Sequence, residues 1–318
     1  MSCTRIVCIE REMTVFEQDV LLWQVHWFSC CLSDKMTLRF QPVAGCFWQD
    51  CRLGAVSDEL ENGGFMVDDA NLSSRFAGTV RLFGKDGFAR LQRAHVCVVG
   101  VGGVGSWAVE TLARSGVGML TLIDGDVVVE SNINRQLHAL DDSLGQPKVS
   151  VLAGRIAKIN PACRVMPVQQ FMTPDNMTVL IGENRFDFVI DAIDSVRDKT
   201  ALIAYCRDHD VPLITVGGAG GQVDPTQIAI CDLSRTQQEP LLAKVRKRLR
   251  SQYGFTRNPK NKFGIDAVYS LEPLRYPVTE TGSDETQAQQ AGFGTTVAVT
   301  ASFGMAAASY VMRRIAGI

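Results

Sequence analysis

A glycine-rich stretch, GVGGVGSW at residues 100–107, follows a run of apolar residues and precedes a helix-like segment. A turn with few side chains lets backbone N–H groups and the N-terminus of the next helix approach an anion, so this pattern predicts a phosphate site. The phosphate belongs either to a dinucleotide or to ATP, and the two ligands imply different chemistry. The glycines that form the pattern are Gly100, Gly102, Gly103 and Gly105.

Polar residues after the glycine stretch favour ATP. Asp124 lies at the end of the second predicted strand, where an acid hydrogen-bonds ribose hydroxyls. The stretch that follows contains Asn132 and Arg135, and GQPK ends in Lys148 at the start of a helix. A triphosphate carries more charge than a pyrophosphate and needs added cations, which a guanidinium fork and an ammonium group supply.

Two acids occur in the segment DAIDS, which ends another predicted strand. We expect Asp194 to hold a Mg²⁺ ion that bridges phosphates, and Asp191 to have a structural role. A lone histidine, His138, follows the Arg135 segment and is assigned no role. Nicotinamide redox chemistry is disfavoured, because the second half of the chain supplies no obvious acid or base for hydride transfer.

Short apolar runs alternate with helical patterns from about residue 85 onward. Continuous apolar strands that alternate with helices indicate an α/β fold, a Rossmann-like, doubly wound and mostly parallel sheet with helices on both faces. Ligands bind such sheets at the carboxyl ends of the strands, where the glycine loop, Asp124 and Asp194 all fall. The predicted strands are 95–100, 119–124, 163–171, 186–194 and 212–218, and the predicted helices are 104–116, 147–160 and 195–209.

Composition excludes several classes of protein. Of 318 residues, 46% are hydrophobic and 21% charged, and the formal net charge is −2, so no overall field drives the chain onto nucleic acid or membrane. The ten cysteines form no CxxC pair, which argues against zinc, and no secretion signal is visible. We expect a cytoplasmic protein. Residues 1–66 lack a sustained period and are expected to be an extension, either poorly ordered or upstream of a true start at Met66, so that the domain is 67–318.

The chain beyond residue 225 forms a smaller C-terminal extension with one more expected strand at 227–233. A basic segment at 241–262 contains no acid, and Tyr253 and Phe255 are interleaved with its cations, as expected for RNA binding; a solvated charged face is the alternative. Residues 291–312 carry no charge but contain no Leu or Ile, so a buried helix is favoured over stable membrane insertion, and peripheral membrane contact stays open. The candidate RNA-binding residues are Lys244, Arg246, Lys247, Arg248, Arg250, Arg257, Lys260 and Lys262.

Five motifs together resemble the ubiquitin-activating-enzyme superfamily of the ThiF and MoeB type. They are GVGGVGSW, LIDGD, SNINRQ, GQPK and DAIDS, in this order and spacing. The stretch VGGAGGQVDPTQI at 216–228 and the basic segment after it resemble one branch, the tRNA threonylcarbamoyladenosine dehydratases. The resemblance covers roughly residues 73–318.

The resemblance implies that a carboxylate attacks the α-phosphate of ATP and releases pyrophosphate. In the dehydratase branch the carboxylate belongs to the threonyl group of a modified tRNA adenosine, and a nucleophile of the same side chain closes a ring with loss of water. The four glycines would hold phosphates, Asp124 ribose and Asp194 Mg²⁺, while Asn132, Arg135 and Lys148 would neutralise the transferring phosphate. Expected partners are tRNA, a second copy in a homodimer and, as one option, a cysteine desulfurase system with its sulfur acceptor.

The chain departs from the superfamily pattern at several points. It lacks the CxxC pairs of many activators, and Ala267 stands where dehydratase-like chains have a cysteine, so no thioester can form there. Gly78 replaces an arginine that reaches the partner subunit in related chains, which leaves Arg75 or Arg81 for that role. Two alternatives remain: an adenylating activator of a ubiquitin-like sulfur carrier, and a non-catalytic nucleotide-binding adaptor.

Overall fold

The computed structural model describes residues 6–8, 26–28, 74–276 and 293–318. The chain divides into two units, Met1–Gly64 and Phe65–Ile318. In the first unit, β1 (Ile6–Cys8) pairs antiparallel with β2 (His26–Phe28). The expectation about the origin and order of residues 1–66 otherwise lies outside the described residues.

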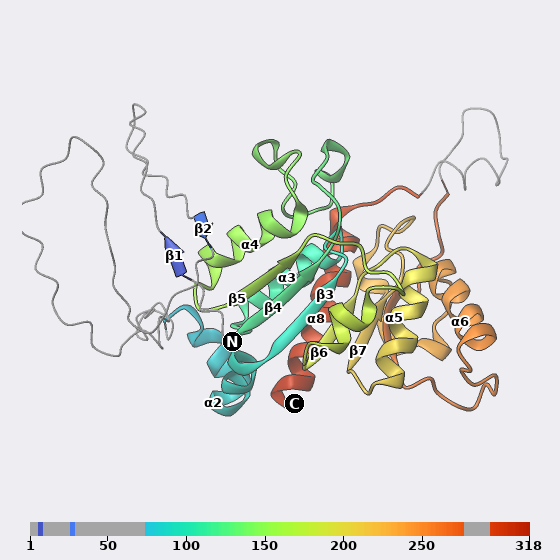
Figure 1. Ribbon diagram of the computed structural model, residues 1–318. Coiled ribbons are helices and arrows are strands. Elements are labelled where there is room, and N and C mark those ends of the chain that lie inside the picture. The colour runs from blue at the N-terminus through green and yellow to red at the C-terminus, as the bar shows by residue number, and fades with distance from the viewer. Residues whose placement is uncertain (1–5, 9–25, 29–73, 277–292) are drawn as a thin grey trace, which may run out of the picture. The chain divides into compact units, whose positions relative to one another are not determined.

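A seven-stranded sheet forms the centre of the second unit (Figure 1). The strands follow the order β5-β4-β3-β6-β7-β9-β8, and all neighbours are parallel except β8, which pairs antiparallel with β9. The predicted mostly parallel sheet is therefore confirmed. Its strands are β3 (His95–Val99), β4 (Met119–Ile123), β5 (Arg164–Val168), β6 (Phe188–Asp191), β7 (Leu213–Val216), β8 (Ile228–Asp232) and β9 (Asp266–Ser270).

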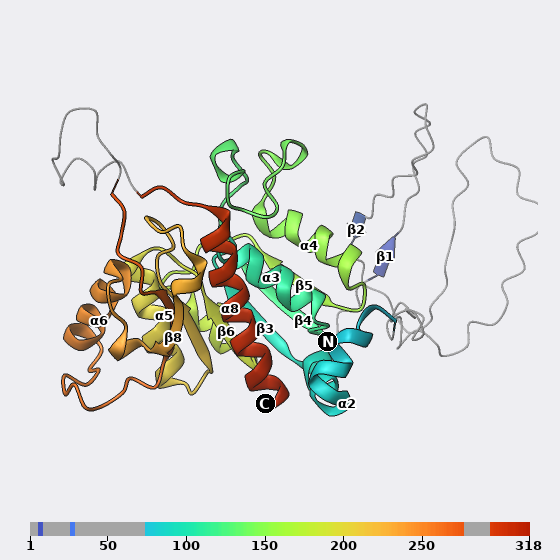
Figure 2. The ribbon, with the colours of Figure 1, turned by 180° about the vertical axis from the view of Figure 1, so that it is seen from behind.

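Helices cover both faces of the sheet (Figures 1 and 2). Because side chains alternate along a strand, Val96 and Val98 of β3 enter one core, and Cys97 and Val99 enter the other. The first core packs against α2 (Ala77–Arg93), α3 (Gly105–Arg114), α4 (Lys148–Ile159) and α8 (Val297–Ala316), and the second against α5 (Val196–Asp208) and α6 (Pro240–Gln252). Short helical turns connect these elements: η1 (Glu130–Asn132), η2 (Asp141–Ser143), η3 (Thr178–Gly182), η4 (Pro225–Gln227) and η5 (Leu233–Arg235).

The long helix α8 crosses α3 on the first face, as the red ribbon in Figure 2 shows. Gly304 lies at this crossing, and a Cβ added to it would lie 2.3 Å from the carbonyl oxygen of Val104. The helix begins at Val297, so the bounds predicted for it, 291–312, were wrong at both ends. In the described part of the chain, no helix combines the length and the apolar character that a membrane span requires.

Candidate nucleotide-binding site

A cavity of about 430 Å³ opens at the carboxyl ends of β3, β4, β6 and β7. This is the edge at which parallel α/β sheets bind their ligands. Loops that follow five of the strands line the cavity: the glycine loop after β3, the acidic loop after β4, residues 171–172 after β5, the start of α5 after β6, and the second glycine loop, residues 217–221, after β7.

The glycine loop uses its glycines for two different purposes. Gly100 has a φ of +82°, and a Cβ on Gly105 would lie 1.8 Å from the carbonyl oxygen of Gly100, so these two glycines permit the tight turn itself. Gly102, Gly103 and Val104 line the cavity, and within the described residues their backbone N–H groups donate no hydrogen bond. Three unpaired N–H groups at the start of α3 form a cradle for an anion.

Asp124 supports this cradle from beneath. It is 8% exposed, and its two carboxylate oxygens accept hydrogen bonds from Val101 N (2.8 Å) and Asp126 N (2.9 Å). The carboxylate thus links the end of β4 to the glycine loop while it still lines the cavity. A carboxylate oxygen accepts more than one hydrogen bond, so a ribose hydroxyl remains a compatible partner.

The NRQ segment brings polar groups over the glycine loop. The Arg135 side chain lies beside Gly103, where a Cβ would meet its Cγ at 3.1 Å, and its Nη1 donates to Ser131 O and Asn134 Oδ1. Asn132 is buried and lines the cavity, and its Oδ1 accepts from Val129 N. Gln136, which also lines the cavity, is 6% exposed, and its Oε1 has no hydrogen-bond partner among the described residues. An orphaned buried amide oxygen at a cavity wall is suited to a bound ligand.

Lys148 lies at the first turn of α4, with 5% of its surface exposed, and its side chain reaches the cavity. Its Nζ forms an ion pair with Asp126 Oδ2 at 2.8 Å. The Asp126 carboxylate is half exposed and lines the same cavity, so it holds the ammonium at the place where a phosphate would compete for it.

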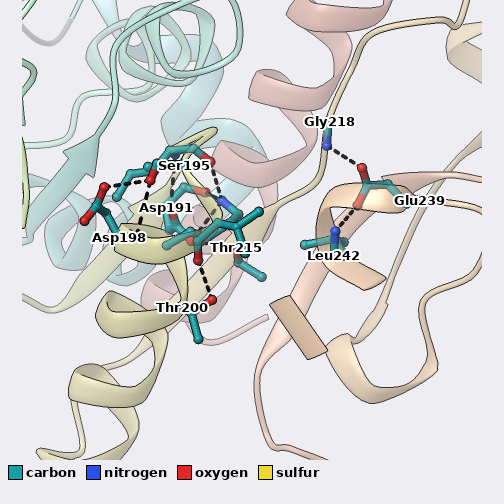
Figure 3. Close-up of polar contacts among 11 residues, drawn as sticks. Asp191, Ser195, Asp198, Thr200, Thr215, Gly218, Glu239 and Leu242 are labelled. Carbon is teal, nitrogen blue, oxygen red and sulfur yellow. Dashed lines mark hydrogen bonds and ion pairs between the residues drawn. The ribbon is translucent and has the colours of Figure 1, made fainter. Parts of the chain in front are cut away.

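The two acids of the DAIDS segment differ in environment, and Figure 3 shows the contacts of the first, Asp191. Asp191 is fully buried, pairs with Lys199 Nζ at 2.9 Å and accepts from Thr215 Oγ1 at 2.7 Å. Burial raises the pKa of its carboxyl, and the charge of Lys199 opposes that rise. Asp194 is exposed at the cavity wall, and no hydrogen bond or ion pair engages its carboxylate within the described residues. Asp191 thus has a structural role, which leaves Asp194 open to a ligand.

The second glycine loop is held by the cap of α6 (Figure 3). Glu239 is 4% exposed, and its carboxylate accepts from Gly218 N at 3.0 Å and from the N–H groups of Leu241 and Leu242. A Cβ on Gly217 would lie 3.0 Å from Glu239 Cδ, so the glycines allow this contact. The floor of the cavity and the start of the basic helix are therefore joined by one side chain.

Comparison with known proteins shows the family to which this chain belongs. The family model described as "ThiF family" matches residues 74–318. The chain belongs to the ThiF family. It is 50% identical over 250 residues to the tRNA threonylcarbamoyladenosine dehydratase of Escherichia coli, which covers 76% of this chain and 93% of that relative. The crystal structure of the E. coli tRNA N6-threonylcarbamoyladenosine dehydratase in complex with ATP matches with a TM-score of 0.71, over 77% of this chain and 95% of that one.

A second kind of ThiF-like relative matches a shorter stretch. The molybdopterin-synthase adenylyltransferase of Salmonella typhimurium is 41% identical over 136 residues, which is 43% of this chain and 54% of that relative. The likeness to the dehydratase extends over most of both chains, whereas the likeness to the adenylyltransferase covers about half of that protein.

The cavity of this ThiF-family chain gathers most of the residues that the sequence predicted for nucleotide and metal binding. Gly105 is the exception, since it lies beneath the loop and does not line the cavity. Sequence reasoning missed Asp126, Phe171, Asp198 and Glu239, because an isolated acid or aromatic residue in a loop carries no signal of its own. The predicted residues that line the cavity are Gly100, Gly102, Gly103, Asp124, Asn132, Arg135, Lys148 and Asp194.

Burial raises the pKa of three described thiols, those of Cys97, Cys163 and Cys206, so these three are not activated. Cys97 and Cys206 are buried, and burial raises the pKa of Cys206 to about 12. Cys163 is half-buried, and burial also raises its pKa to about 12. Ala267, at the position that the resemblance assigns to a cysteine, is fully buried in β9.

The basic segment forms α6 and the loop after it. Some of its cations have partners within the protein, and others are exposed to solvent. Arg246 donates to Thr236 Oγ1, and Arg250 lies over the ring of Phe263 and donates to Thr256 O, so these two guanidinium groups have partners within the protein. Phe255 is 5% exposed, so this aromatic residue of the basic segment packs inside the protein and does not present its ring to RNA. The exposed cations are Lys244, Lys247, Arg257, Lys260 and Lys262, and Arg248 is half-buried.

The arginines considered for a role across a dimer lie near the start of α2. Arg75 donates through Nη1 to the carbonyl oxygens of Lys158 (3.2 Å) and Ile159 (2.8 Å), at the end of α4. Arg81 is exposed on α2. Arg75 therefore contributes to packing within the chain, and Arg81 is the freer of the two.

Proposed function

We propose that this chain catalyses the ATP-dependent dehydration of threonylcarbamoyladenosine in tRNA. The observation that carries the proposal is the cavity at the strand ends, where Arg135, Lys148 and Asp194 surround an unpaired N–H cradle. A relative that is 50% identical over 76% of this chain is named as this dehydratase, and a structure of it with ATP has the same fold.

The groups around the cavity suit carboxylate adenylation. The N–H groups of Gly102, Gly103 and Val104 would hold phosphate oxygens, and Arg135 and Lys148 would offset the charge that develops as the substrate carboxylate attacks the α-phosphate. A carboxylate oxygen bonds to phosphorus while the bond to pyrophosphate breaks. A nucleophilic atom of the carbamoyl group in the same threonylcarbamoyl modification then attacks the activated carbonyl, AMP leaves with the carboxylate oxygen, and a proton is lost. The net change in the nucleoside is the loss of one water.

Nucleoside recognition would fall to the loops after β4 and β5. Asp124 lines the cavity near the glycine loop and would accept a hydrogen bond from a ribose hydroxyl. Phe171 is 61% exposed at the cavity wall and packs against Gly125, where a Cβ would lie 2.7 Å from its ring. An exposed ring at this place suits an adenine base.

The acids at the start of α5 fit a magnesium ion. Asp194 and Asp198 both line the cavity, and the Asp194 carboxylate has no partner among the described residues. In the part of the chain that the structure describes, no three His, Cys, Asp or Glu side chains gather as metal ligands. Mg²⁺ is commonly bound by one or two carboxylates together with substrate phosphates, so this pair is sufficient. A bound Mg²⁺ would neutralise phosphate charge, with Asp194 as its ligand.

A homodimer would follow the superfamily pattern.

The exposed cations of the basic segment would contact tRNA phosphates. Lys247 and Arg257 border a hollow of about 390 Å³ beside α6, together with Arg246 and Arg250. Four cations around one hollow favour a phosphate backbone as the ligand. Within the described residues no ion pair involves these four cations, and the charge of Glu239 acts on Arg246.

Nucleoside mass spectrometry tests the proposed function. Wild-type protein, ATP and Mg²⁺ should remove one water from threonylcarbamoyladenosine in tRNA, with release of AMP and pyrophosphate. Asp194→Asn keeps the shape of the side chain but removes its charge, and we expect the rate to fall about 100-fold or more. Asp86→Asn, an exposed change on α2, is the matched control. If tRNA binds but keeps its water while a sulfur-carrier C-terminus is adenylated, the activator function replaces the dehydratase.

A further inference from the structure

Two exposed aromatic side chains meet beside the nucleotide cavity. Tyr276 is 46% exposed and Phe293 is 38% exposed, and their ring centroids lie 5.4 Å apart at an interplanar angle of 50°. Large apolar side chains cost free energy when they face water, and the adenylation chemistry proposed above gives neither ring a task.

The second glycine loop fixes both aromatic residues in place. Arg275, which precedes Tyr276, donates its backbone N–H to Gly221 O at 2.8 Å. Gly221 N donates to Gly294 O at 2.8 Å, directly after Phe293. A Cβ on Gly220 would lie 2.8 Å from the Cβ of Phe293, so the absence of a side chain lets Phe293 pack on the loop. The rings are thus attached to the same loop that forms the cavity floor.

The aromatic pair lies between the nucleotide cavity and the cations of α6. On one side, Gly220 and Thr295 line the cavity, and Phe293 contacts Gly220. On the other side, Tyr276 lines a hollow of about 400 Å³ together with Arg246. That hollow shares Ala243 and Arg246 with the cationic hollow beside α6. The two hollows beside α6 therefore adjoin each other, and the tyrosine lines one of them.

We propose that Tyr276 and Phe293 form a stacking platform for the purine base of the RNA substrate that carries the reacting carboxylate. This inference rests on the proposed function, because it concerns the nucleoside that delivers the carboxylate. The base must leave its stack in the RNA before the attached carboxylate can reach a phosphate inside the cavity. Aromatic rings replace the lost stacking contacts, and cations on α6 hold the flanking phosphates.

Kinetics with matched ring variants test the platform. Tyr276→Ala and Phe293→Ala remove one ring each, and we expect each to lower kcat/KM for tRNA about tenfold or more, by analogy with other base-stacking residues. Tyr276→Phe and Phe293→Tyr keep the rings and should restore most of the value. The Kd for ATP should stay unchanged in all four variants. Leu82→Ala, which truncates an apolar side chain that is 75% exposed on α2, is the control.

A binding measurement keeps the platform testable apart from catalysis. A tRNA with 2-aminopurine in place of the modified adenosine should fluoresce less when bound to the wild type than to the Tyr276→Ala/Phe293→Ala double variant, since stacking on a ring quenches the probe. Equal emission from both complexes, or unchanged kcat/KM in the alanine variants of an active enzyme, would overturn the platform. An inactive wild type that still shows the difference in emission would instead overturn the proposed function and leave the platform standing.

Discussion

His138 is buried beside the nucleotide site, and neither of its ring nitrogens has a hydrogen-bond partner among the described residues. Burial, together with the charge of Lys148, lowers its pKa from 6.5 to about 4. The folded protein therefore disfavours a protonated His138. Protonation of the unfolded chain begins near pH 6.5 and favours unfolding as the pH falls toward 4.

His138→Gln removes this titration. Between pH 6.5 and about pH 4, the free energy of unfolding of the wild type should fall relative to the variant by about 1.4 kcal/mol per pH unit. Above pH 7 the difference between the two proteins should be constant. Urea unfolding at several pH values measures both. If the free energies of unfolding of the two proteins differed by the same amount throughout the acid range, His138 would have the same pKa in the folded and the unfolded protein.

Cys206→Ala tests whether a thiol takes part in the reaction. Because burial raises the pKa of Cys206 to about 12, its thiolate is scarce at neutral pH, and we expect the variant to keep its rate of water loss within about twofold. Cys231→Ala should behave in the same way, since this half-buried thiol donates to Asp232 O within the chain. A loss of activity that serine does not restore would instead indicate a thioester step.

At the scale of single residues, sequence predicted those parts of the site that belong to motifs. Arg135, Lys148 and Asp194 line the cavity as expected, because each belongs to a recognisable motif. Glu239 could not be predicted. Its partner Gly218 is 21 residues away, and only the packing of α6 against the end of β7 brings the two together.

At the scale of helices and strands, the packing of α8 on α3 connects the core to the nucleotide site. Gly304→Ala would place a methyl group 2.3 Å from Val104 O, at the N-terminus of α3, and we expect a loss of about 1–3 kcal/mol in the free energy of unfolding. Val104 also lines the cavity, so the Kd for ATP should rise. Gly154→Ala on the exposed face of α4, where no atom lies within 4 Å, is the control and should stabilise the protein slightly. Equal effects of the two changes would show that the crossing is loose.

Helices were predicted better than the order of strands. The helix expected at 147–160 spans Lys148–Ile159, and that expected at 195–209 spans Val196–Asp208, because apolar spacing is a local property. The position of β9 between β7 and β8 was not predicted. Neighbours in a sheet are chosen by contacts between distant segments, and such contacts leave no periodic trace in either strand.

For the whole molecule, a net charge of −2 requires that RNA binding depend on a local group of cations. Lys247→Ala should weaken tRNA binding and reduce the slope of log K against log salt by about one, because one phosphate contact is lost. Lys85→Ala, which removes another exposed lysine, on α2, should leave the slope unchanged. Filter binding between low and moderate salt measures the slopes. An equal decrease in slope from both substitutions would mean that α6 is not a preferred surface for tRNA binding.

The position of α8 also bears on how the chain is synthesised. This helix supplies Val299, Phe303, Ala307 and Val311 to the core that faces α3, yet its residues leave the ribosome after all seven strands. Until they emerge, the apolar surface that α2, α3 and the sheet present to them stays open to solvent and to other chains. Nascent molecules that stall before residue 297 should therefore be clients of chaperones.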